Sequence, residues 1–156
     1  MRLIWFSARS LMKIHSFKES DAGVVAELSN ENAFAFQYSK VTPAFLKRMC
    51  SHKTYKMFVL KDSGVIVGFC GVNYKGRKAA ELGPICVKNE RRMHGLGRML
   101  VMRVFEFVEP MNCDKLWVKV RASNRTAQTF FRSMGFVKSG EAMARGVPVV
   151  VMEHSL

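Results

Sequence analysis

Residues 87–98 are the most informative part of the sequence and read Val87-Lys88-Asn89-Glu90-Arg91-Arg92-Met93-His94-Gly95-Leu96-Gly97-Arg98. A strand-like apolar segment precedes it and a helix-like amphipathic segment follows it. Gly95 and Gly97 have no Cβ atom, so the backbone can turn sharply and leave its N–H groups accessible. Those groups and the positive end of the following helix dipole form an anion site. The surrounding cations favour a pyrophosphate as its ligand.

Two better-known phosphate motifs do not fit this stretch. A dinucleotide-binding G-x-G-x-x-G would need glycine at position 100, where Leu100 stands. A P-loop would need Gly-Lys followed by Ser or Thr, and that sequence is absent. Glycines that only begin a helix would explain Gly95 but not the cations around it. The pattern alone leaves a phosphate site and a plain helix start both open.

The segments on either side of the stretch are predicted from their periodicity. Residues 79–87 form a strand that Gly83-Pro84 interrupts, and a bulge is expected there because proline cannot donate to the ladder. Residues 96–108 form a helix, because apolar residues recur at helical spacing and Pro110 stops it.

The rest of the chain alternates helices, strands and turns. Helices are predicted at residues 20–28, with Asp21 capping the first turn, and from Thr42 to about residue 49, with Pro43 at the first helical position. A third covers residues 126–134 and is closed by Gly135. Strands are predicted at residues 57–60, 65–72, 116–121, 136–143 and 147–152. This order indicates an α/β fold with a mixed, mostly antiparallel sheet and helices on both faces.

Composition bounds the class of protein. The 156 residues fit a single domain, 1–156, and 49% of them are hydrophobic, which favours a globular fold. Residues 1–11 either extend the first strand or are an N-terminal extension. Without an apolar run long enough to span a membrane, and without signal-peptide features, a cytoplasmic location is expected. The four cysteines fit neither a disulfide framework nor a zinc site, so reduced thiols and no metal are expected.

Two motifs together resemble a known family. Arg92, Gly95 and Gly97 match the Arg/Gln-x-x-Gly-x-Gly/Ala signature of the GNAT superfamily of N-acetyltransferases. A second stretch resembles that family's later motif, in which Asn, Ala, an aromatic pair and Gly-Phe recur: Asn124-Arg125-Thr126-Ala127-Gln128-Thr129-Phe130-Phe131-Arg132-Ser133-Met134-Gly135-Phe136. The resemblance covers residues 55–140 well, and the first fifty residues are compatible with it.

The resemblance implies acetyl-CoA as cosubstrate and a sheet splayed open after the strand at residues 79–87. Backbone groups of Ile85, Cys86 and Val87 would then pair with the pantetheine arm. The pyrophosphate would be held by the loop that contains Arg92, Met93, His94, Gly95, Leu96, Gly97 and Arg98. Asn124 and Phe131 would line the other side of the cofactor.

An amine attacks a thioester only when it is neutral. A lysine-like amine has a pKa of about 10.4, so holding it neutral at pH 7 costs roughly 4–5 kcal/mol, part of which a general base offsets. Glu81 is the candidate base, since it lies fourteen residues before Gly95, where some members of the family place a basic glutamate. The alternative is a solvated strand residue or a partner for Lys78 or Lys119.

The general acid is not identified by the sequence. Many relatives carry tyrosine at the position of Phe131, which has no hydroxyl. Either the thiolate leaves unaided, another group such as Tyr74 or Tyr38 serves, or the protein is a poor catalyst. Cys86 is interpreted as a small buried residue rather than a nucleophile.

The predicted function is acetyl-CoA-dependent N-acetyl transfer to a primary amine of a small molecule or peptide, by direct attack in a ternary complex. One alternative is a catalytically weak acyl-CoA-binding module. A less favoured one is a basic nucleic-acid-binding protein, for which Trp117, Lys119 and Arg121 share one strand face. No membrane partner is expected.

The acceptor and the assembly stay open at this level. The net charge of +13 disfavours very basic acceptors, unless an acidic group on the early helix compensates locally. Asp21, Glu27 and Glu31 are the residues that could do so. The protein is expected to be a monomer or a homodimer, with the strand at residues 147–152 either pairing across a dimer or lying inside its own sheet.

Overall fold

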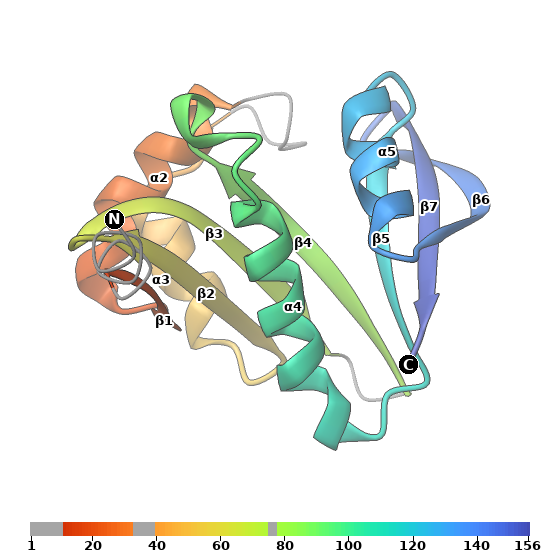
Figure 1. Cartoon of the computed structure of the whole chain (residues 1–156), viewed down its shortest axis with the longest axis horizontal. Coiled ribbons are helices and arrows are strands. Elements are labelled where there is room, and N and C mark those ends of the chain that lie inside the picture. The colour runs from red at the N-terminus through yellow and green to blue at the C-terminus, as the bar shows by residue number, and fades with distance from the viewer. Residues whose placement is uncertain (1–10, 33–39, 75–77) are drawn as a thin grey trace, which may run out of the picture.

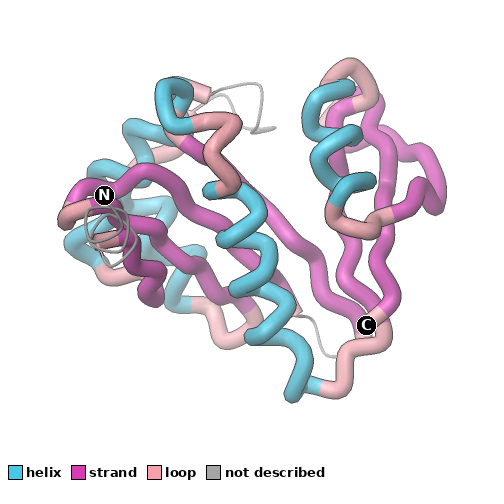
Figure 2. The backbone as a smooth tube through the Cα atoms, viewed as in Figure 1, coloured by secondary structure: helices cyan, strands magenta, loops and turns pink. Residues whose placement is uncertain are grey.

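The computed structural model describes residues 11–32, 40–74 and 78–156. One seven-stranded sheet with the order β1-β2-β3-β4-β5-β7-β6 runs through them (Figures 1 and 2). Its strands are β1 (Met12–Ser16), β2 (Tyr55–Asp62), β3 (Val65–Asn73), β4 (Ala79–Val87), β5 (Lys115–Arg121), β6 (Val137–Ala144) and β7 (Val147–Ser155). Every neighbouring pair is antiparallel except β4 and β5, which run parallel. The predicted mixed, mostly antiparallel sheet is therefore confirmed.

The helices cover both faces of this sheet, as predicted. They are α2 (Ala22–Glu31), α3 (Pro43–Ser51), α4 (Leu96–Val108) and α5 (Arg125–Ser133), with short 3-10 turns η1 (Glu19–Asp21), η2 (Asn89–Arg91) and η3 (Glu109–Met111). α4 and α5 bury their apolar stripes in one core cluster, and α2 and α3 bury theirs in another on the opposite face. In Figure 1, α4 crosses in front of β3 and β4, and α5 lies beside β5 and β7.

Local sequence signals explain several boundaries. Thr42 is the N-cap of α3 and its Oγ1 accepts a hydrogen bond from the Phe45 N–H at 3.1 Å, with Pro43 at the first position. The expected irregularity at Gly83-Pro84 is present, because the β3–β4 register shifts between Cys70 and Val72. The final strand β7 lies inside its own sheet, between β5 and β6.

The prediction for the first helix was wrong in two respects. α2 begins at Ala22 rather than Ser20, and Asp21 forms no side-chain hydrogen bond to cap it. The Asp21 carboxylate instead accepts from the Lys18 N–H at 2.9 Å and lies 3.4 Å from Lys61 Nζ. A charged residue that is only 3% exposed needs such partners, and β2 supplies one from a distant part of the chain.

Candidate functional site

The sheet opens into a fork between β4 and β5. The parallel pairing of these strands covers four residue pairs, from Ala79 opposite Lys115 to Leu82 opposite Val118. β4 continues for five more residues and pairs there with β3 alone, through Ile85, Cys86 and Val87 opposite Cys70, Phe69 and Gly68. Its other edge is therefore a row of backbone groups facing the fork, among the residues described. An extended chain with amide groups can add to such an edge.

The fork lies beside the start of α4, where the glycines stand. Gly95 is the N-cap with φ +77°, and a Cβ atom built there would meet nothing within 4 Å. The helical ladder begins with Met99, whose N–H donates to the Gly95 carbonyl at 3.1 Å. The N–H groups of Leu96, Gly97 and Arg98 precede that first bond, and glycine brings no side chain to cap them. These N–H groups are therefore available to an external anion.

Two cations of the loop, Arg91 and Arg92, hold it against neighbouring elements. Arg91 forms an ion pair with Asp62 at the end of β2. Arg92 donates from Nε to the Val87 carbonyl at 3.3 Å and from Nη2 to Asn32 Oδ1 at 2.6 Å. Asn32 is only 8% exposed, so these contacts tie the loop to the end of α2. Arg92 thus holds the loop in place through contacts within the chain.

The remaining loop residues differ in exposure. Met93 has φ +64° and is 96% exposed, and His94 is also exposed. The Leu96 side chain is buried in the core beneath α4, so only its backbone can face a ligand. Arg98 lies on the exposed side of α4 and its Nη1 is 3.7 Å from Met134 Sδ, which links α4 to the end of α5.

Side chains of β4 alternate between the two cores. Ile85 and Val87 pack against the α4 side, whereas Cys86 points to α2, with Sγ 3.9 Å from the Leu28 carbonyl. Burial raises the pKa of the Cys86 thiol to about 12, with a smaller opposing effect of Arg92. The thiol is therefore protonated at neutral pH, which agrees with a packing residue and not with a nucleophile.

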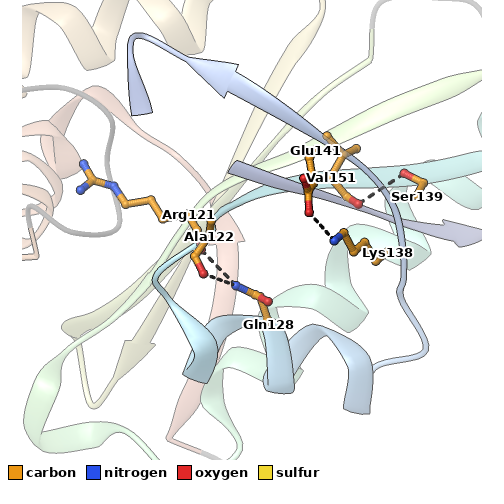
Figure 3. Close-up of polar contacts among 7 residues, drawn as sticks. All are labelled: Arg121, Ala122, Gln128, Lys138, Ser139, Glu141 and Val151. Atoms are coloured by element: carbon orange, nitrogen blue, oxygen red, sulfur yellow. Dashed lines mark hydrogen bonds and ion pairs between the residues drawn. The ribbon is translucent and has the colours of Figure 1, made fainter. Parts of the chain in front are cut away.

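The second wall of the fork is α5. Asn124 is its N-cap, and the Asn124 Oδ1 accepts from the Ala127 N–H at 3.1 Å. Gln128 Nε2 donates to the carbonyls of Arg121 and Ala122 at 3.2 and 3.0 Å, so α5 holds the end of β5 (Figure 3). The part of β5 that β4 leaves unpaired is braced by this helix.

Two adjacent aromatic residues of α5 have different surroundings. Phe131 is 2% exposed and packs edge-to-face with Phe130 and Phe136, at ring-centroid distances of 5.1 and 5.2 Å. Phe130 is half-buried and faces Gly97, where a Cβ atom would lie 3.3 Å from its ring. Glycine at position 97 therefore allows α5 to approach the first turn of α4, which brings the two sequence motifs together.

Glu81 lies at the base of the fork, within the last residues that β4 pairs with β5. It is opposite Asn73 on β3 and Trp117 on β5, and residues opposite each other share one face of a sheet. This is the face of α2 and α3, because the neighbouring Ala80 and Leu82 pack on the α4 side. The ion pairs once considered with Lys78 or Lys119 are absent among the described residues, where Glu81 forms none.

Comparison with known proteins agrees with this geometry. Residues 24–136 match the Acetyltransferase (GNAT) family. A [ribosomal protein bS18]-alanine N-acetyltransferase of Escherichia coli is 30% identical over 106 residues, which are 68% of each chain. The structure of an acetyltransferase-type protein from Salmonella typhimurium with its cofactor acetyl-CoA has a TM-score of 0.80 at 16% identity. The match covers 93% of this chain and 94% of that one. A Vibrio cholerae spermidine N-acetyltransferase in complex with CoA and spermine has a TM-score of 0.78 at 18% identity, covering 94% and 96%.

This chain belongs to the acetyltransferase (GNAT) family. The family assignment predicted from Arg92, Gly95, Gly97 and the later motif is confirmed, and acetyl-CoA is the cosubstrate that goes with it.

Other candidates for the GNAT chemistry lie elsewhere. Tyr74 packs edge-to-face on Phe107 near the end of α4, at a ring-centroid distance of 5.6 Å, and so has a packing role. Tyr38 lies outside the described residues. No cluster of His, Cys, Asp or Glu that could hold a metal occurs in the described part of the chain. Within the same part, no helix is long and apolar enough to cross a membrane.

Three residues around the fork escaped the sequence analysis. Phe130 was noted only as one of a pair, although it is the aromatic residue that faces Gly97. Asn32 anchors Arg92 from 60 residues away, and no local signal indicates that contact. Asn73 lies beside Glu81 with a buried Oδ1 that has no hydrogen-bond partner among the described residues. A polar residue at the end of an apolar strand is the only sign of it in the sequence.

Proposed function

We propose that this chain binds acetyl-CoA in the fork between β4 and β5 and transfers the acetyl group to a primary amine by direct attack in a ternary complex. The observation that carries the proposal is the end of the parallel pairing at Leu82 and Val118, after which one edge of β4 stays unpaired up to Val87, in the strand that leads to the helix start at Gly95. An unpaired strand edge and a set of uncapped N–H groups then serve one elongated ligand with amides at one end and phosphates at the other.

Each part of this ligand has a matching part of the chain. The backbone of Ile85, Cys86 and Val87 supplies the edge that pairs with the pantetheine. N–H groups from Gly95 to Arg98 surround the pyrophosphate, with charge from Arg98 and His94. The half-buried ring of Phe130 covers the opposite side, and Asn124 and Phe131 hold α5 in place for it.

Glu81 acts as the general base in this proposal. Its carboxylate is on the face of the sheet opposite α4, so the acceptor amine approaches from that face while the thioester lies in the fork. The amine gives its proton to the carboxylate as its nitrogen attacks the thioester carbon, and the C–S bond then breaks.

The leaving thiolate departs without a protein acid in this proposal. Phe131 offers no hydroxyl and its ring is buried between two other phenylalanines. A thiol has a pKa near 8.5, so its thiolate is a tolerable leaving group at pH 7 to 8. The same observation favours the second candidate, an acyl-CoA-binding module with weak catalysis.

The acceptor class is inferred from both the site and the relatives. The two named enzymes are N-acetyltransferases of the alanine of a ribosomal protein and of spermidine, so each acts on a nitrogen of its acceptor. A small molecule or a peptide with a primary amine is therefore proposed here. The cytoplasmic location and the monomeric or homodimeric state stay predictions.

Thiol release from acetyl-CoA in the presence of an amine panel tests the proposal. We expect turnover by the wild-type protein. Glu81→Gln should lower kcat by a factor of about 10² or more and leave the Kd for acetyl-CoA unchanged. Glu106→Gln, on the exposed side of α4, is the matched control and should leave kcat unchanged. Binding of acetyl-CoA without turnover of any amine would favour the weak module. Salt-sensitive retention of DNA or RNA without acetyl-CoA binding would favour the nucleic-acid reading.

A further inference from the structure

A row of side chains crosses the sheet at the base of the fork, on the face opposite α4. Glu81 of β4 is opposite Trp117 of β5, and Trp117 is opposite Glu153 of β7. The next residue of β5 on this face is Lys119, which is exposed, and its Nζ is 5.3 Å from the centroid of the Trp117 ring. Lys119 therefore stands where β5 first separates from β4.

The charges in this row are unevenly balanced. Glu153 is neutralised by Lys115, whose Nζ lies 3.2 Å from its Oε1. Lys119 is opposite Val151 on β7, and it forms no ion pair with any residue that the structure describes. Its ammonium rests on an indole ring, which attracts a cation but leaves its charge uncompensated.

An acceptor that reaches Glu81 with its amine must lie across Trp117 and therefore close to Lys119. Diagonal neighbours on adjacent strands have Cα atoms roughly 7–8 Å apart, so groups only a few ångströms from the amine come within reach of the ammonium. A second cation in the acceptor meets like charge there, whereas a carboxylate or phosphate gains a charge-assisted hydrogen bond.

We propose that Lys119, above the Trp117 ring, selects acceptors that carry an anionic group beside the primary amine. This inference rests on the proposed function and specifies its substrate class. A free α-amino acid and a peptide whose first residues are acidic both have the required chemistry. Polyamines carry a second cation instead, and this site disfavours them.

Two matched pairs of acceptors test the selection by thiol release. The first is leucine against leucinamide, and the second is an Ala-Glu-Glu peptide against an Ala-Lys-Lys peptide. The amine of leucinamide is less basic and so more often neutral at pH 7, which makes a preference for leucine run against intrinsic reactivity. We expect kcat/KM to favour the anionic member by about fivefold or more, through KM. The pair that shows the preference identifies the source as a free amino acid or a peptide.

Variants of Lys119 assign the preference to that residue. Lys119→Met should abolish it and Lys119→Glu should reverse it, a swing of roughly 10- to 100-fold in the ratio of kcat/KM values. Lys13→Met, at an exposed position of the distant edge strand β1, should keep the wild-type ratio. The KM for acetyl-CoA should be the same in all four proteins.

The possible failures are distinct. If the wild-type protein turns over amines but its ratio is the same in Lys119→Glu, the selection by Lys119 is refuted and the acetyl transfer stands. If no amine of any charge is turned over, the proposed function fails and the inference fails with it.

Discussion

The N–H groups of residues 96–98 at the start of α4, which we call the cradle, can be tested by adding a single methyl group beside them. Gly95→Ala places a Cβ atom at the N-cap of α4, where the structure leaves open space within 4 Å. Gly146→Ala is a matched control, because Gly146 has φ +78° against +77° for Gly95 and equally open surroundings. It lies in the turn between β6 and β7, away from the cradle.

The two substitutions should cost the same stability. A non-glycine residue in the left-handed region costs roughly 1–2 kcal/mol, and neither new methyl group meets a neighbour. For a domain of this size, each kcal/mol lowers Tm by about 2–4 °C. Both variants should therefore unfold about 2–8 °C below the wild-type protein, and within a degree or two of each other.

Their affinities for acetyl-CoA should differ. In Gly95→Ala the methyl group displaces the phosphates from the N–H groups of the first turn, and a hydrogen bond to a charged group contributes about 1.5–3 kcal/mol. Loss of one such bond raises Kd about 10- to 150-fold. Gly146→Ala removes no contact with the ligand, so its Kd should stay within about twofold of wild type, a margin smaller than one weak contact.

Isothermal titration calorimetry at one fixed salt concentration measures the three Kd values, and thermal unfolding measures the three Tm values. Equal Kd values in all three proteins would refute the assignment of the cradle to the pyrophosphate. Equal weakening in both variants would show instead that backbone strain, and not the location of the methyl group, lowers affinity.

Three further predictions concern stability. In a double-mutant cycle by urea unfolding, Arg92→Ala and Asn32→Ala should show a coupling of about 1 kcal/mol from their 2.6 Å contact, and additive effects would contradict the bracing role. Burial raises the pKa of Cys86 from 9.0 to about 12, so its contribution to stability is present below pH 9 and lost as pH rises toward 12. The unfolding free energy should hence fall less steeply above pH 9 in Cys86→Ala, and parallel pH profiles would contradict this. Gly71→Ala should lower Tm markedly, since its Cβ atom would meet the buried Tyr55 hydroxyl oxygen, and an unchanged Tm would show that Tyr55 moves freely.

The central elements were predictable because their local signals agree with one another. α4 has the predicted bounds of Leu96–Val108, since its apolar stripe begins after Gly95 and ends before Pro110. β4 likewise has the predicted bounds of Ala79–Val87. The start of α2 was not predictable, because the 3-10 turn η1 precedes it and the Asp21 carboxylate binds backward to the Lys18 N–H and across to Lys61 of β2.

The site was predictable in its location but not in the orientation of its side chains. The two glycines and the later motif indicated the cradle and its facing helix. The sequence does not show that Arg92 turns to Asn32, or that Cys86 faces α2, because both depend on packing between distant segments. Asp21 was considered as an acidic group for the acceptor, but its burial against Lys61 removes it from that role.

The short parallel ladder between β4 and β5 has a mechanical consequence. It divides the molecule into two lobes, β1 to β4 with three helices and β5 to β7 with one, which the sheet joins through only four residue pairs. The second connection is α4, whose Phe105 ring contacts Phe136 and His154 and whose apolar stripe shares one core with β5 and α5. A ligand bound in the fork would contact both lobes. At a concentration of 100 Kd it would raise the free energy of unfolding by about 2.7 kcal/mol. Saturation with acetyl-CoA should therefore protect the chain against proteases that cleave its unfolded state, to the extent of that stabilisation.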